Sequence, residues 1–108
     1  MEAERDFYIE TVQKILLKHK GTYEGKMMSS PGVKYNNKVF VFYLKKEMIF
    51  RLGDEFSPLA YNIKNPRLLD PFKNKPPLKG WFIVDFNQKD RWEELSELAY
   101  EFVKTLKK

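Results

Sequence analysis

The side chains able to do chemistry are few in this sequence, and they lie far apart along it. The chain has one histidine, His19, and no cysteine, which excludes disulfides, thiol catalysis and cysteine-ligated metal sites. A zinc site or a catalytic imidazole needs further ligands or bases, and the chain has no second histidine. Because His19 ends a predicted helix, we expect its side chain to interact with the helix dipole or the last carbonyl groups.

Two other polar pairs each have a catalytic and a structural interpretation. Ser29 and Ser30 lack the G-x-S-x-G surroundings of a nucleophile, so a role in a turn is favoured. Asp54 and Glu55 could act as paired carboxylates in acid–base chemistry, but solvated charges near a helix start are the interpretation we favour. The five glycines are too dispersed for a phosphate-binding loop. We therefore predict a protein that is not an enzyme and has no metal and no cofactor.

The best candidate for a binding segment is the basic stretch 64–80. It contains a single acid, Asp70, and has Phe72 within it and Trp81 beside it. Its cations could contact phosphates while an aromatic ring stacks on a base. The alternative is a solvated loop anchored by its aromatic residues, which we favour because no nucleic-acid-binding motif accompanies the charge. If nucleic acid binds, the predicted contacts are Lys64, Arg67, Lys73, Lys75, Lys79 and Trp81.

The overall composition is that of one globular domain. The chain has 108 residues, of which 43% are hydrophobic and 32% charged, and its net charge of +5 favours acidic partners only mildly. The N-terminal segment has acids where a signal peptide has basic residues, and no apolar run reaches the length of a membrane span. We therefore expect a cytoplasmic protein that makes no membrane contact.

The elements that must position these residues begin and end with a helix. Residues 2–19 have apolar side chains at helical spacing, and a second helix should begin at Asn87, with Asp90 completing a variant capping box. Between them we expect a strand over 23–28, an extended piece over 33–35, a hairpin, a short helix that starts at Ser57-Pro58, and a strand over 81–86. The expected fold class is α+β, in the order α-β-β-β-(short α)-β-α.

The central element is the hairpin in the segment 38–53, where apolar runs 39–44 and 48–52 flank a short charged break. A two-residue turn in this break would use Lys45 and Lys46, although such turns favour Gly, Asn or Asp. Strict alternation of side chains would then give one face a large apolar patch with one charge, Arg51. Either the short helix and the 64–80 loop cover this patch, or a second copy of the chain does. We hypothesise a homodimer whose contact face contains Phe40, Phe42, Leu44 and Ile49.

Three segments resemble the TfoX N-terminal-domain-like family, which is related to the MmcQ/YjbR-like proteins. The matching residues are Lys26-Met27-Met28-Ser29 with Gly32-Val33 and Lys38-Val39-Phe40, then Met48-Ile49-Phe50-Arg51, then Pro77-Leu78-Lys79-Gly80-Trp81. Tyr100 is similar to a tyrosine in the closing helix of the YjbR-like proteins. The resemblance covers Gly21 to Leu106, so we expect a single domain of this kind over residues 1–108.

The resemblance implies a two-layer fold in which an antiparallel sheet packs against the N- and C-terminal helices. It also implies a small, non-enzymatic regulatory or protein-interaction domain, whose partner is another protein or a second copy of itself. A nucleic-acid-binding module that uses the basic 64–80 loop is the alternative.

Overall fold

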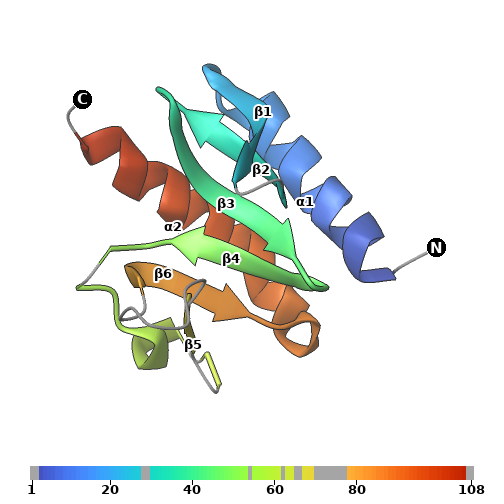
Figure 1. Ribbon diagram of the computed structural model, residues 1–108, viewed down its shortest axis with the longest axis vertical. Coiled ribbons are helices and arrows are strands. Elements are labelled where there is room, and N and C mark those ends of the chain that lie inside the picture. Colours follow the sequence, from blue (N-terminus) through green and yellow to red (C-terminus); the bar gives the residue numbers. More distant parts are fainter. Residues whose placement is uncertain are drawn as a thin grey trace.

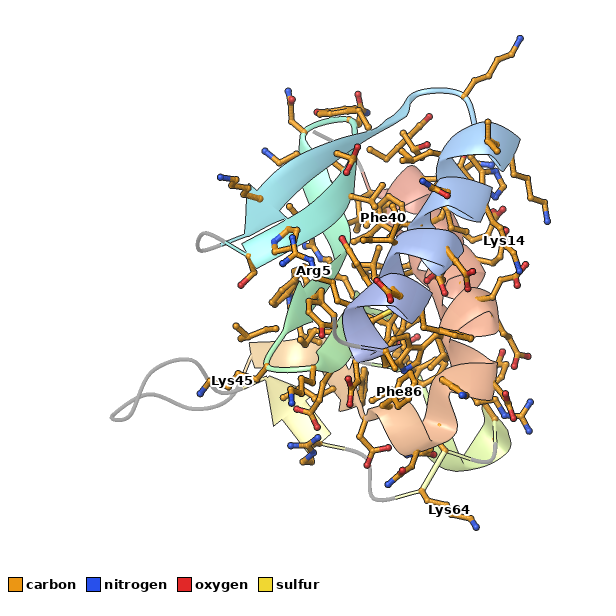
Figure 2. All side chains as sticks on the ribbon, turned by 90° about the vertical axis from the view of Figure 1, so that its right-hand side faces the viewer. Arg5, Lys14, Phe40, Lys45, Lys64 and Phe86 are labelled. Carbon is orange, nitrogen blue, oxygen red and sulfur yellow. The ribbon has the colours of Figure 1, made fainter. Side chains whose placement is uncertain are left out.

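Two helices lie together on one face of a single antiparallel sheet, which is the predicted two-layer α+β fold (Figures 1 and 2). The computed structural model describes residues 3–27, 30–53, 55–61, 63–64, 67–69 and 78–106. In chain order the elements are α1 (Ala3–Lys18), β1 (Thr22–Met27), β2 (Ser30–Tyr35), β3 (Lys38–Leu44), β4 (Glu47–Arg51), the 3-10 helix η1 (Pro58–Tyr61), β5 (Arg67–Leu69), β6 (Leu78–Val84), the 3-10 helix η2 (Phe86–Arg91) and α2 (Trp92–Thr105).

The six strands follow the order β1-β2-β3-β4-β6-β5, and every pairing is antiparallel. The predicted hairpin is β3–β4, at the middle of the sheet, and the extended piece over 33–35 is part of the full strand β2. The connection over 64–80 adds the short edge strand β5, which its weak periodicity did not predict. The sheet is therefore larger than the sequence indicated, but the predicted order of helices and strands is confirmed.

Two tight turns close the hairpins on either side of β3. In each turn both central residues have positive φ: Asn36 at 57° and Asn37 at 66°, then Lys45 at 52° and Lys46 at 66°. Leu44 pairs directly with Glu47, so the β3–β4 turn has two residues. Asparagine is common in this left-handed backbone conformation because its short polar side chain can form local hydrogen bonds. Lysine is disfavoured there, because its Cβ lies too close to the following carbonyl oxygen. The β3–β4 turn is therefore strained by its own sequence.

Replacing this turn by Lys45→Asn and Lys46→Gly should stabilise the protein. Asn-Gly suits positive φ at both positions, so we expect the free energy of unfolding to rise by about 1 kcal/mol. Urea denaturation followed by circular dichroism measures the change. An unchanged or lower midpoint would contradict the assigned turn geometry.

A β-bulge in β3 decides which side chains face the helices. Val33 pairs with Val41 but Lys34 pairs with Val39, so Phe40 is an extra residue in β3. Phe40 and Val41 consequently both join the core beneath the helices, and Figure 2 shows Phe40 between the sheet and α1. The prediction that Phe40 shares a face with Phe42 is therefore wrong, because a bulge interrupts the strict alternation on which it rested.

The outer face of the sheet, turned away from the helices, carries a second apolar cluster. Val39, Phe42 and Ile49 form its centre, with Leu44, Trp81 and Ile83 packed against them. Phe42 has no exposed surface and Ile49 only 1% within the single chain. These two residues of the predicted dimer face are therefore buried without a second copy, whereas Leu44 keeps partial exposure.

The core between the sheet and the helices is rich in aromatic side chains. Trp92 is fully buried at the start of α2, with the rings of Phe7 and Phe86 each 5.7 Å from its own. Tyr8 of α1 packs on Tyr43 at 5.1 Å between ring centroids. Burial raises the pKa of the Tyr8 hydroxyl, and the nearby Glu24 carboxylate acts in the same direction. The phenol therefore stays neutral, as a core residue should.

The second helix begins later than predicted. Residues 86–91 form η2, with Gln88 outside helical geometry, and the α-helical turns of α2 begin at Trp92 without a side-chain cap. The expected Asn87 capping box is therefore wrong. The short helix near Ser57-Pro58 is confirmed, but as a 3-10 turn. Of the helices that the structure describes, none is long and apolar enough to cross a membrane.

Candidate functional site

The residues predicted to touch nucleic acid do not form one free basic surface in the described part of the chain. The guanidinium of Arg67 forms an ion pair with Glu47 across the sheet. Lys64 is exposed, and its backbone N–H donates to the side chain of Gln88 at 2.6 Å. Trp81 packs against Phe42 with ring centroids 5.7 Å apart. Two of these residues are thus already engaged within the protein.

The remaining predicted residues can be placed only in part. Lys73 and Lys75 lie outside the described residues, and of Lys79 only the backbone, in β6, is described. Ser29 and Asp54 also lie outside them, while Ser30 is buried at the start of β2. The basic-loop hypothesis is consequently neither supported nor contradicted at its central lysines.

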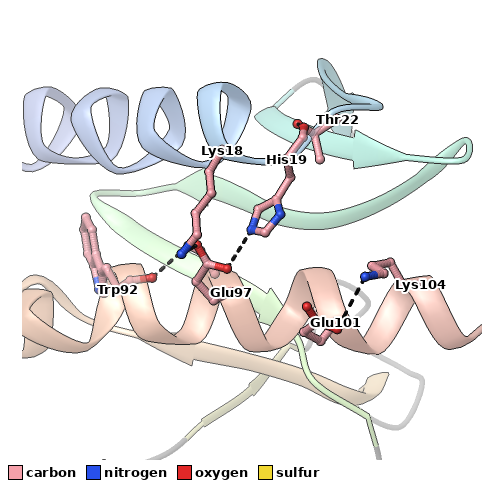
Figure 3. Close-up of polar contacts among 8 residues, drawn as sticks. Lys18, His19, Thr22, Trp92, Glu97, Glu101 and Lys104 are labelled. Carbon is pink, nitrogen blue, oxygen red and sulfur yellow. Dashed lines mark hydrogen bonds and ion pairs between the residues drawn. The ribbon is translucent and has the colours of Figure 1, made fainter.

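His19 belongs to a polar cluster between the two helices, shown in Figure 3. Its Nε2 lies 2.7 Å from Oε1 of Glu97 in α2, and the second carboxylate oxygen of Glu97 lies 3.3 Å from Nζ of Lys18. The imidazole also stacks on Tyr100, with ring centroids 3.9 Å apart. One carboxylate thus holds two side chains from the end of α1.

This cluster connects the two helices through the Glu97 carboxylate. The hydroxyl nearest in sequence, on Thr22, donates to the His19 carbonyl oxygen at 2.6 Å and is engaged in ending α1. A nucleophile activated by an imidazole would instead direct its hydroxyl at the ring nitrogen. His19 therefore interacts mainly with α2 and only through its backbone with the end of its own helix, unlike the sequence-based expectation.

Substitution of His19 by Ala should remove both the hydrogen bond to Glu97 and the stacking on Tyr100. We expect the free energy of unfolding to fall by about 1–2 kcal/mol. The matched control is Lys14→Ala, which breaks the Lys14–Glu93 pair between the same helices, where the side chains are 64% and 54% exposed. That control should cost about 0.5 kcal/mol or less. Equal losses in the two variants, measured by chemical denaturation, would contradict the connection of the helices through Glu97.

A different group of residues has the character of a binding site. Arg51, at the end of β4, is half-buried, and its guanidinium carbon lies 5.6 Å from the ring centroid of Trp81 and 5.9 Å from that of Phe102. Trp81 belongs to the outer-face cluster and Phe102 to α2 on the opposite side. The guanidinium therefore meets a ring from each layer of the protein.

Two glycines shape the backbone beside Arg51. The Gly80 carbonyl oxygen accepts hydrogen bonds from the N–H groups of Leu52 at 2.7 Å and Gly53 at 3.1 Å. Gly53 has φ of +92°, and a Cβ on it would lie 2.7 Å from the Phe102 ring. The chain can turn here and lie flat against the aromatic ring only because this position is glycine.

An open hollow of about 540 Å³ is lined by Phe102, one of the two rings that Arg51 contacts. Its described lining consists of Leu52, Gly53, Glu55 and Phe102. The lining is therefore mostly apolar, with one acidic residue. Phe102 joins the hollow to the guanidinium of Arg51. We refer to Arg51, Trp81 and the four lining residues as the Arg51 site.

Sequence reasoning listed Trp81 and Glu55 for other reasons and missed Arg51 as a functional residue. The signal was present, since Arg51 is the charge that interrupts the second apolar run of the hairpin. The structure also pairs Arg51 with Trp81 across β4 and β6.

Comparison of the chain with family models, curated proteins and solved structures finds no match. The resemblance to the TfoX N-terminal family therefore stays a prediction. Within the described ranges, no three His, Cys, Asp or Glu side chains come together as a metal site would require.

Proposed function

We propose that this protein is a small non-enzymatic protein-interaction domain and that its partner binds at the Arg51 site. The observation that carries the proposal is a half-buried arginine that contacts two aromatic rings, one of which, Phe102, also lines an open, mostly apolar hollow. Apolar concavities with a few placed polar groups are the usual form of binding sites, and arginine and aromatic residues dominate the energetics of protein interfaces. The proposal also includes a regulatory role, and it includes neither catalysis nor a bound metal.

Selection from a random dodecapeptide library tests this function. The immobilised protein should enrich peptides that, in nitrogen-15 NMR, shift the amide signals of Leu52, Gly53 and Glu55. Single-stranded and duplex oligonucleotides serve as competing probes at low salt. Failure to enrich any peptide that binds at these amides would contradict the proposal, whatever the oligonucleotides do.

Nucleic-acid binding by the 64–80 loop stays a second prediction, supported by the net charge of +5. Its test is a salt titration of oligonucleotide binding to the wild type and to a triple alanine variant of Lys73, Lys75 and Lys79. The hypothesis requires that the variant lose both affinity and salt dependence. Unchanged binding by the variant would reject it.

The homodimer and the cytoplasmic location also stay predictions. Of the predicted dimer face, Phe42 and Ile49 are buried within one chain, whereas Leu44 is partly exposed. Sedimentation equilibrium at micromolar concentrations tests self-association, and a monomer over the whole range would contradict it.

A further inference from the structure

Arg51 differs from Arg67 and Arg91 in forming no ion pair with a carboxylate of the described residues. Arg67 pairs with Glu47 and Arg91 with Glu94, whereas the guanidinium of Arg51 lies over the rings of Trp81 and Phe102. A half-buried guanidinium loses part of its hydration without gaining an anion in exchange. It is therefore available to a ligand that brings one.

The two rings orient this guanidinium in advance. Aromatic faces attract the cation and restrict its rotamers, so less side-chain entropy is lost when an anion binds. The planar fork can then donate two parallel N–H bonds to the two oxygens of a carboxylate. A lysine at the same position could not form this pair of parallel hydrogen bonds, so the preference for a two-oxygen anion is specific to arginine.

The residues that line the hollow restrict which chemical groups can accompany the anion in a ligand. Leu52 and Phe102 offer apolar surface next to Arg51, whereas the Glu55 carboxylate repels further negative charge. A nucleic-acid strand brings a phosphate at every nucleotide and would set several charges against Glu55. A ligand with a single carboxylate beside an apolar side chain suits both the Arg51 guanidinium and the apolar surface of Leu52 and Phe102.

The shape of the hollow favours a side chain over a free small molecule. Sites for small ligands enclose most of the ligand surface, but this hollow is open to solvent. An open concavity can still receive side chains from an extended segment whose backbone lies outside it. The proposed interaction function and the shape of the site thus lead to the same class of ligand.

We infer that the Arg51 site binds an acidic residue of a partner protein, with its carboxylate on Arg51 and the neighbouring apolar side chain over Phe102. The inference rests on the proposed interaction function and adds to it the chemistry of the ligand. It assigns Arg51 the role of the anion-binding residue and Phe102 that of the apolar contact.

Two blocked pentapeptides and one oligonucleotide test this inference by NMR titration of the full chain. The probes are acetyl-Ala-Phe-Glu-Ala-Ala-amide, the same peptide with Gln for Glu, and hexathymidylate DNA. The Glu peptide should shift the amides of Leu52, Gly53 and Glu55 and the indole N–H of Trp81. It should bind roughly tenfold more tightly than the Gln peptide, because only a carboxylate forms the charge-assisted pair.

The variant Arg51→Met should weaken binding of the Glu peptide by roughly tenfold or more, since it keeps an unbranched side chain on the rings but removes the charge. The matched control is Lys45→Gln, which removes one positive charge at the opposite end of β4 and should leave the affinity unchanged. A largely unchanged amide spectrum outside the site shows that the variant is folded.

Equal binding of the Glu and Gln peptides, undiminished binding to Arg51→Met, stronger shifts with DNA, or no shift with either peptide would each overturn the inference. The library selection separates this failure from that of the proposed function. If selected peptides bind at the hollow without an acidic residue, the interaction function stands and only the carboxylate recognition falls.

Discussion

Gly32→Ala should destabilise the protein by about 3 kcal/mol, although it adds a single methyl group. A Cβ on Gly32 would lie 2.6 Å from the carbonyl oxygen of Val41 and 2.8 Å from the Cβ of Phe42. The first atom belongs to the backbone of β3, and the Cβ of Phe42 is fixed to that backbone. A change of side-chain rotamer therefore cannot relieve either contact. The strand β2 would have to move away from the middle of the sheet.

The matched control is Gly25→Ala, because Gly25 is the direct partner of Gly32 across β1 and β2. A Cβ there would approach only the side chain of Lys34, at 2.8 Å, and that chain can swing away. We expect a change of about 0.5 kcal/mol or less in the free energy of unfolding. Urea denaturation of both variants measures the difference, and similar stabilities would show that β2 and β3 are not as close as described.

Phe42→Ala should cost about 3–5 kcal/mol, which makes it the most damaging substitution that we predict. The ring lies on the outer face of the sheet but has no exposed surface, and it packs on Trp81 and Ile49. Truncation would leave a cavity in this cluster and loosen the ring that supports Arg51. Thermal denaturation should show a much lower midpoint.

Leu17→Ala is the control for this prediction, since Leu17 is 88% exposed on α1 and little surface is at stake. Its free energy of unfolding should change by about 0.5 kcal/mol or less. A small effect of Phe42→Ala would mean that the outer face is open, as the dimer hypothesis required.

The Arg51 site depends on the outer-face cluster and on the turn at Gly53. The outer-face cluster around Phe42 supports Trp81 from one side, and the turn at Gly53 brings the backbone against Phe102 on the other. Proper testing of Arg51 therefore uses substitutions of the arginine itself. Changes to its supports would alter stability and binding together.

The sequence by itself determined the kinds of elements and their order. Helical spacing in residues 2–19 and 92–106 and the apolar runs around Lys45-Lys46 depend on contacts between near neighbours in the chain, so their patterns are readable locally. The two-layer α+β fold follows from these elements, because the apolar stripes of the helices must be buried and the apolar strands offer a surface for them. The order and fold class were confirmed on this basis.

Only the tertiary structure decided which side chains meet. The bulge at Phe40 is set by the pairing of β2 with β3, and it moves Phe40 from the predicted outer face to the helix side. The same holds for His19 with Glu97 and for Arg51 with Trp81 and Phe102, which are far apart in sequence. Such contacts depend on strand register and helix placement, and neither leaves a periodic signal in the residues that make them.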